Sequence, residues 1–127
     1  MDKAFIVKVP VWDALVVVGC GPTDGRFKRL LSKWLTRNEI EGYLKTCNSH
    51  GVRGCVHRGE PGCAHALWIP SPPNNPENMG YFAHEVAHVA FQMLRNKGVW
   101  HTTSSEESYT YLMQYLTKEI LTQLKKR

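Results

Sequence analysis

The sequence predicts an α+β fold in a single domain that spans residues 1–127. Two segments near the start, 4–9 and 14–19, are dominated by β-branched residues and have the patterning of strands. Two long segments near the end, 76–97 and one that reaches about 125, carry apolar residues at helical spacing. Strands and short helices followed by two long helices are typical of α+β domains. The length suits one domain and is sufficient for a real hydrophobic core.

The middle of the chain predicts shorter elements. Helices are expected over about 24–36 and 38–47, and Asn38 would cap the second of them. The Gly-rich segment 48–63 is expected to form a loop or hairpin, and 65–70 is expected to form a strand.

The two long helices have recognisable start and stop signals. Pro76 suits the first turn of a helix, and Gly98 suits its C-terminal cap. Ser104 or Ser105 would cap the final helix, with acidic side chains in its first turn. No internal repeat or linker divides the chain.

Composition and charge exclude some classes of partner. No apolar run approaches the ~20 residues that a membrane span requires, so no membrane partner is expected. The start of the sequence lacks an apolar signal segment, so a cytoplasmic location is expected, whereas the oligomeric state stays open. The net charge is +5, and five basic residues lie in the segment 26–37. They favour a solvated helix face over a nucleic-acid site, because no nucleic-acid-binding motif accompanies them.

A segment rich in cysteine and histidine follows the second short helix. It contains Cys47, His50, Cys55, His57, Cys63 and His65. The paired C-x-x-C spacing of zinc ribbons is missing, which favours a loop with reduced thiols over a structural metal site. A second metal held by the three cysteines of this segment stays open as an alternative.

The most specific motif is His84-Glu85-x-x-His88, within the expected helix 76–97. Histidines four residues apart project from one helix face, so their imidazoles can occupy adjacent corners of a tetrahedral zinc site. Glu85 lies about a third of a turn away, where it can take a proton from a zinc-bound water without binding the metal. Apolar neighbours predict that all three polar side chains are buried, a costly arrangement that a bound metal would relieve.

A third ligand is available at the start of the final helix, where Glu106 and Glu107 lie side by side in the sequence. A helix–loop–helix turn would return the chain antiparallel to the first long helix. One of these carboxylates would then lie beside His84 and His88. Two histidines, one glutamate and an open fourth position are typical of a catalytic zinc site.

With these residues, the sequence resembles the zincin metallopeptidases. The likeness is to the gluzincin-like ImmA/IrrE type and to small peptidases encoded by phages and prophages. It covers 65–120 and rests on the H-E-x-x-H motif and on "EESYTYLMQYL" at 106–116. The resemblance implies a minimal zincin-like domain with zinc-dependent protease activity on a protein or peptide. In that interpretation Glu85 is the general base and Zn²⁺ is bound by His84, His88 and Glu107, with Glu106 as the neighbouring alternative.

The resemblance carries further expectations for the cleft. It implies that the strand at 66–70 lines the cleft, where Trp68 is either a substrate contact or a core residue. Many gluzincins carry an Asp or Asn on the second helix as a partner for the second histidine, and this sequence has Tyr111 there. Tyr109, Tyr111 and His101 are candidate donors to the oxyanion of the reaction.

Two other functions are compatible with the sequence. A zincin fold could bind zinc or a partner without cleaving, but Glu85 is not needed to hold metal, and its presence favours catalysis. A nucleic-acid-associated protein similar to the SprT-like proteases would combine the H-E-x-x-H motif with a second Cys/His metal site. The number of metal ions bound per chain separates these cases.

Overall fold

A computed structural model describes residues 2–60 and 64–126 and confirms the α+β class. Its sheet has four strands in the order β1-β2-β4-β3. Strand β2 pairs antiparallel with β1 and parallel with β4, whereas β3 pairs antiparallel with β4. The strands are β1 (Lys3–Val9), β2 (Ala14–Cys20), β3 (Cys55–His57) and β4 (His65–Ile69).

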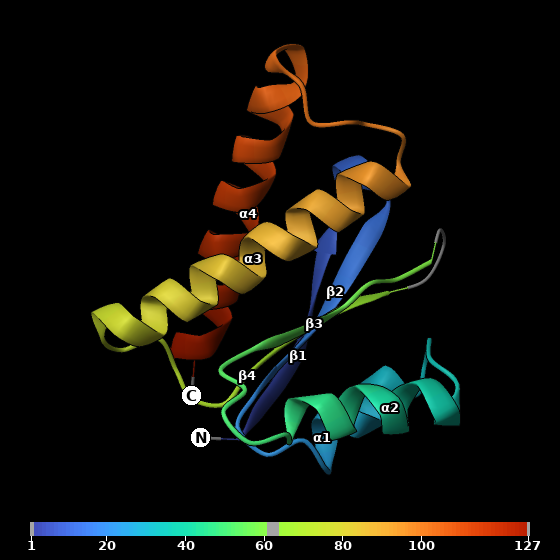
Figure 1. The fold of residues 1–127 in the computed structure, drawn as a ribbon, viewed down its shortest axis with the longest axis vertical. Coiled ribbons are helices and arrows are strands. Elements are labelled where there is room, and N and C mark those ends of the chain that lie inside the picture. The colour runs from blue at the N-terminus through green and yellow to red at the C-terminus, as the bar shows by residue number, and fades with distance from the viewer. Residues whose placement is uncertain (1, 61–63, 127) are drawn as a thin grey trace.

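The sheet lies between two layers of helices (Figure 1). One face packs against α1 (Arg26–Leu31) and α2 (Arg37–Cys47), and the other packs against α3 (Pro76–Asn96) and α4 (Glu106–Lys125). Successive residues of a strand point to opposite faces, so Val17 of β2 belongs to the first core and its neighbours to the second. Burial on both faces explains why the central strands are apolar without alternation.

A glycine in the central strand β2 allows α1 to approach the sheet closely. A Cβ atom added at Gly19 would lie 2.6 Å from ring atoms of Phe27. The Phe27 ring is fully buried and meets Tyr43 edge-on, with 6.1 Å between ring centroids. Glycine in a strand interior often marks such a close approach.

The start of α2 differs from the expectation. Its N-cap is Thr36 rather than Asn38, and α1 is shorter than the helix expected over 24–36. The Thr36 hydroxyl accepts a hydrogen bond from the Glu39 amide, and the Glu39 carboxylate accepts one from the Thr36 amide. This reciprocal capping box satisfies two amides that would otherwise lack a partner, so the helix begins at Arg37.

The predicted start and stop of α3 are confirmed. Pro76 is its first residue, directly after Asn75, whose side chain accepts a hydrogen bond from the Asn78 amide. Gly98 has a φ of +80° and follows the last turn, where its amide donates to the Arg95 carbonyl. A left-handed glycine at this position is the usual end of a helix. Within residues 2–60 and 64–126, no helix combines the length and hydrophobicity needed to cross a membrane.

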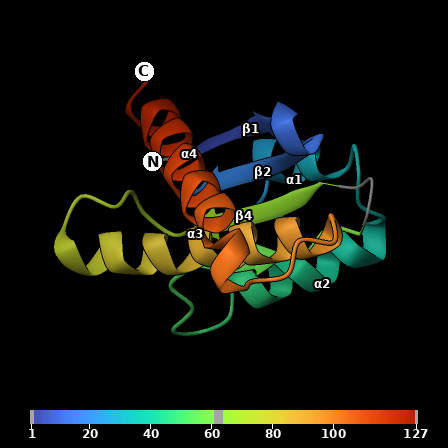
Figure 2. The ribbon, with the colours of Figure 1, turned by 90° about the horizontal axis from the view of Figure 1, so that it is seen from above.

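Helix α4 crosses α3 steeply instead of running antiparallel to it, as both views show (Figures 1 and 2). The expected antiparallel return is therefore wrong. The physical reason is a second set of contacts between α4 and the edge strand β1. The Lys3 ammonium donates to the carbonyls of Gln123 and Leu124, and the Tyr115 hydroxyl donates to the Lys8 carbonyl.

Candidate metal centre

The two histidines of the H-E-x-x-H motif face each other on α3. Their Nε2 atoms are 3.0 Å apart, and their ring centroids are 4.6 Å apart. Two imidazole nitrogens bound to one tetrahedral zinc at ~2.0–2.1 Å would be about 3.4 Å apart. His84 and His88 are therefore near the spacing that a shared metal ion would impose.

The burial of the motif differs from the expectation. Glu85 is 8% exposed, but His84 and His88 are both exposed. The apolar residues of α3, such as Phe82 and Val89, fill only the side toward the sheet. The expected burial is therefore confirmed for the glutamate and wrong for the two histidines, which water can solvate.

Glu85 packs against the backbone of the segment before β3. A Cβ atom added at Gly54 would lie 2.6 Å from Cγ of Glu85 and 3.0 Å from its Cδ. Burial raises the pKa of the Glu85 carboxyl, and the neighbouring His84 and His88 oppose this shift. A carboxylate with a raised pKa is better suited to accept a proton near neutral pH.

An open cleft of about 710 Å³ lies beside the motif, between the segment before β3 and the N-terminal half of α3. We call it the α3 cleft; it is lined by Gly51, Arg53, Gly54, Pro76, Glu77, Gly80, Tyr81, His84 and Glu85. One histidine and the glutamate of the motif thus border the same space, which is large enough for several side chains of a peptide.

The cleft is lined by the segment that leads into β3 and by no residue of β4. Strand β4 pairs with β2 on one side and β3 on the other, so it has no free edge. The expectation that 66–70 lines the cleft is therefore wrong. Trp68 is 6% exposed, belongs to the core on the α1 and α2 side, and donates its indole N–H to the Gly21 carbonyl. It is a core residue, not a substrate contact.

The structure does not bring the expected third ligand to the histidine pair. Among residues 2–60 and 64–126, no three His, Cys, Asp or Glu side chains gather closely enough to hold a metal ion. Glu106 and Glu107 are both exposed. Tyr109 is buried and donates its hydroxyl to the Val99 carbonyl, 2.6 Å away. Because successive helical residues differ by about 100°, Glu107 points to nearly the opposite side of α4 from Tyr109.

The three candidate oxyanion donors lie away from the α3 cleft. The Tyr109 hydroxyl already donates to a backbone carbonyl. The His101 ring packs edge-on against Phe91 and Tyr109, with centroid distances of 5.5 and 4.9 Å. Tyr111 is 66% exposed and lines a different pocket. None of the three borders the α3 cleft.

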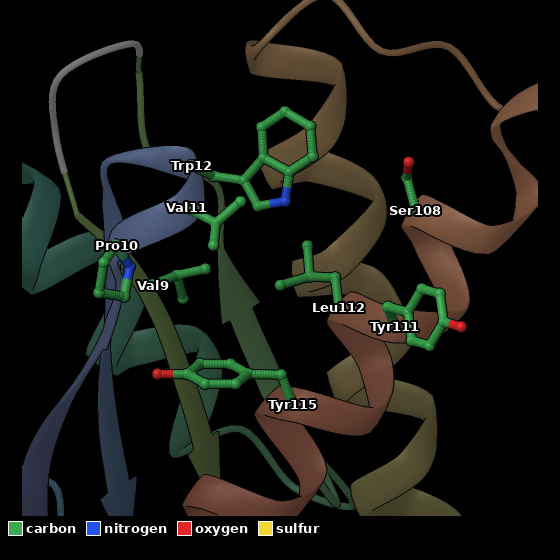
Figure 3. A pocket seen from close by; sticks show the side chains of 8 residues that line it. All are labelled: Val9, Pro10, Val11, Trp12, Ser108, Tyr111, Leu112 and Tyr115. Carbon is green, nitrogen blue, oxygen red and sulfur yellow. The ribbon is translucent and has the colours of Figure 1, made fainter.

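The pocket that contains Tyr111 is apolar and lies between α4 and the short turn η1 (Pro10–Trp12) that follows β1 (Figure 3). Its volume is about 390 Å³, and Trp12 and Tyr115 lie at its two ends with Leu112 between them. The residues that line it include no His, Cys, Asp or Glu, so the pocket offers apolar surface but no usual metal ligand.

The Cys/His-rich segment is distributed over several environments. Cys47 and Cys55 lie together between α2 and β3, whereas His50 is exposed and Cys63 lies outside the described residues. His57 lies 4.0 Å from a Glu39 carboxylate oxygen. A second metal site is therefore not assembled from the described members of this segment.

The basic residues of 26–37 are solvated, as expected. Arg26, Lys28, Arg29, Lys33 and Arg37 are all exposed. Arg37 forms an i,i+4 ion pair with Glu41 at 3.2 Å. Such an exposed pair contributes little to stability.

We expect the buried side chain of His65 to make the stability of the fold sensitive to acid. Its Nδ1 accepts a hydrogen bond from the Gly59 amide, and burial lowers the pKa of His65 from 6.5 to about 4. Because the folded-state pKa is depressed, the stabilisation is complete above pH 6.5 and is lost as the pH falls toward 4. At 1.36 kcal/mol per pKa unit, the loss is on the order of 3 kcal/mol by pH 4.

Urea unfolding at pH 7.5, 5.5 and 4 measures this effect. The free energy of unfolding of the wild type should differ between these pH values. We expect this difference to be mostly lost in His65→Gln and to be retained in the exposed control His50→Gln. An unchanged pH dependence in His65→Gln would show that other groups cause the acid sensitivity.

No protein-family model, curated protein or solved structure matches this chain. The zincin resemblance therefore rests on the motif and its surroundings alone.

Some residues of the α3 cleft were not anticipated. Tyr81 could have been found, because it lies three and four residues before His84 and Glu85 and so shares their side of the helix. Arg53 and Gly54 could not, because they belong to a Gly-rich segment whose position depends on packing between α2 and β3. No local pattern distinguishes Gly54 from the other glycines of that segment.

Proposed function

We propose that this protein is a zinc-dependent peptidase whose active site is the α3 cleft. The observation that carries the proposal is the convergence of His84 and His88, with Nε2 atoms 3.0 Å apart, directly beside the buried Glu85. An ordinary surface histidine pair needs no such neighbour, whereas hydrolysis at a metal needs a base next to the two ligands.

His84 and His88 would hold the ion through their Nε2 atoms. Zinc bound there would polarise a carbonyl group and lower the pKa of a coordinated water. Glu85 would accept the proton of the attacking water and later deliver it to the leaving amine. Packing against Gly54 holds the Glu85 side chain in place, and burial keeps its pKa raised for this task.

The substrate class follows from the strand at the cleft. Within the described residues β3 pairs only with β4, so one edge of β3 has no strand partner and could pair with an extended peptide. Addition of a strand to a sheet edge recognises the peptide backbone, while cleft side chains select residues of the substrate. Arg53 and Tyr81 are placed for such selection because both line the α3 cleft.

Glu107 remains the proposed third ligand, with Glu106 as the alternative. Binding of the ion would require the first turn of α4 to turn toward α3, because Glu107 points away from α3. That rotation would have to release Tyr109, which lies in the same turn, is 1% exposed and donates its hydroxyl to the Val99 carbonyl.

Metal content per chain tests the proposal. After zinc loading and removal of free metal, we expect one zinc per wild-type chain by elemental analysis. His88→Ala is expected to lose the ion because it leaves a single imidazole in the pair. The matched control His50→Ala removes an exposed histidine outside the cleft and should keep one zinc.

The other outcomes each have a defined meaning. Loss of zinc in Glu107→Ala but not in Glu106→Ala identifies the third ligand. Two zinc ions in the wild type, one of which survives His88→Ala, would favour the nucleic-acid-associated alternative with a Cys/His site. A zinc-loaded wild type that retains no metal would overturn the proposed function.

A further inference from the structure

An arginine borders the α3 cleft without a counter-ion from the protein. Of the described residues that line this cleft, Arg53 is the one that carries a permanent positive charge. Its side chain is exposed. In the part of the chain that the structure describes, no carboxylate forms an ion pair with Arg53, because the ion pairs there lie within α2 and between α2 and β3. An unneutralised cation therefore borders the space that would hold the substrate.

The backbone on both sides of Arg53 is held in place. Before it, the half-buried side chain of Val52 packs against the core on the α1 and α2 side. After it, Gly54 contacts the Glu85 side chain. The Tyr43 hydroxyl then donates to the backbone carbonyl of the first residue of β3 at 2.7 Å. The origin of the Arg53 side chain is therefore fixed, while its guanidinium group is open to a ligand.

The distance of Arg53 from Glu85 along the backbone sets where on a substrate it would act. Arg53 directly precedes Gly54, which contacts Glu85, and consecutive Cα atoms are about 3.8 Å apart. An extended peptide advances about 3.3 Å per residue. The guanidinium group would therefore meet a substrate group that lies within about three residues of the bond beside Glu85.

The two carboxyl groups that border the cleft are engaged elsewhere. The Glu77 carboxylate accepts a hydrogen bond from the Tyr81 hydroxyl at 3.2 Å, on the same helix. Glu85 is 8% exposed and packs against Gly54. Neither neutralises Arg53, so a carboxylate of the substrate would supply the counter-ion that the cleft lacks. The net charge of +5 also attracts acidic peptides over longer distances.

We propose that Arg53 makes the α3 cleft selective for peptides that carry a carboxylate at one fixed position near the cleaved bond. A guanidinium group presents its N–H donors as a planar fork, which matches the two oxygens of a carboxylate. An Asp or Glu side chain supplies this group, and so does a free C-terminus. The inference names the substrate class of the proposed peptidase and rests on that function, whereas binding of the carboxylate is measurable without catalysis.

Mapping of cleavage sites tests the selectivity. A synthetic peptide library of random sequence is digested by the zinc-loaded wild type, and the cleaved bonds are identified by mass spectrometry. We expect Asp and Glu to be enriched about fivefold or more at one position near the cleaved bond. Arg53→Glu should replace this enrichment by enrichment of Lys and Arg at the same position. The matched control Arg29→Glu reverses an exposed arginine of α1, on the other face of the sheet, and should keep the wild-type pattern.

The two sources of the carboxylate are distinguished by a second library whose C-termini are amidated. Enrichment of Asp and Glu that persists in amidated peptides identifies a side chain as the ligand of Arg53. Cleavage at a fixed distance from the C-terminus that is lost on amidation identifies the terminal carboxylate instead. Either result supports the proposal if Arg53→Glu abolishes it. Cleavage without a positional preference for a carboxylate, or a preference that Arg53→Glu leaves unchanged, would overturn it.

Peptide binding separates failure of this inference from failure of the peptidase function. Fluorescence anisotropy measures the affinity of zinc-loaded Glu85→Gln for three labelled peptide pools: amidated with a central Glu, amidated with a central Gln, and with a central Gln and a free C-terminus. We expect one of the two pools with a carboxylate to bind about fivefold more tightly than the amidated Gln pool, and less so at high salt.

The added substitution Arg53→Gln should make the three affinities equal. Discrimination between the pools without any cleavage by the wild type would support the carboxylate site and overturn the peptidase function. Cleavage without discrimination would do the opposite. Equal affinity of Glu85→Gln for all three pools would overturn the role of Arg53.

Discussion

Replacing Glu85 with glutamine is expected to lower the rate of peptide-bond hydrolysis about 10²–10⁴-fold, the range typical for loss of a general base. Glutamine has nearly the same shape as glutamate, so the contact with Gly54 should persist. It cannot accept a proton near neutral pH. The measurement is digestion of casein, an unfolded protein, by zinc-loaded enzyme, with peptides quantified by mass spectrometry.

The control for this experiment comes from the same cleft. Glu77 also lines the α3 cleft but lies in the first turn of α3, two turns before the motif. Glu77→Gln should therefore retain activity within a few-fold. Both variants should keep the wild-type zinc content, because neither residue is a proposed ligand. A Glu85→Gln variant that binds zinc and digests casein at the wild-type rate would exclude Glu85 as the base.

Replacing Phe27 with alanine is expected to reduce the free energy of unfolding by about 3–5 kcal/mol. The ring is fully buried between α1 and the sheet, where it covers Gly19 and meets Tyr43 edge-on. No side chain at Gly19 can move in to fill the space, so the cavity would remain. The loss is a large part of the stability of a typical domain.

Urea unfolding of Phe27→Ala measures this loss. The neighbouring Lys28→Ala is the matched control, because Lys28 is an exposed residue on the same short helix. Its effect should stay within about 0.5 kcal/mol. If Phe27→Ala lowers the free energy of unfolding by less than about 1 kcal/mol, α1 contributes little to the stability of the core.

Local patterns predicted most of the fold. The β-branched runs predicted β1 and β2 within one residue at each end. Side chains that are buried on both faces of a sheet must be apolar, and this leaves a clear pattern in the sequence. Pro76 and Gly98 marked the ends of α3, because each has a backbone preference that suits only one end of a helix. The three-residue strand β3 lies inside the expected loop or hairpin, since its pairing depends on β4 rather than on its own sequence.

The candidate site was predicted less completely. Residues four positions apart lie on the same face of a helix, so the sequence could predict that His84 and His88 face each other. The position of Glu107 could not, because it depends on how α4 lies across α3 and β1. Contacts between residues at opposite ends of the chain fix the direction of α4. One example is the hydrogen bonding of Lys3 to the last turn of α4.

The bond from Lys3 to the last turn of α4 also has a consequence for the order of folding. Its partners are separated by 120 residues, so forming it closes a loop of almost the entire chain. The entropy of loop closure grows with the logarithm of loop length, and such contacts raise the contact order that slows folding. The hairpin of β1 and β2 closes a far shorter loop. We therefore expect the first strand to gain its sheet partner early, and the last helix to cover its edge only when the rest of the domain is in place.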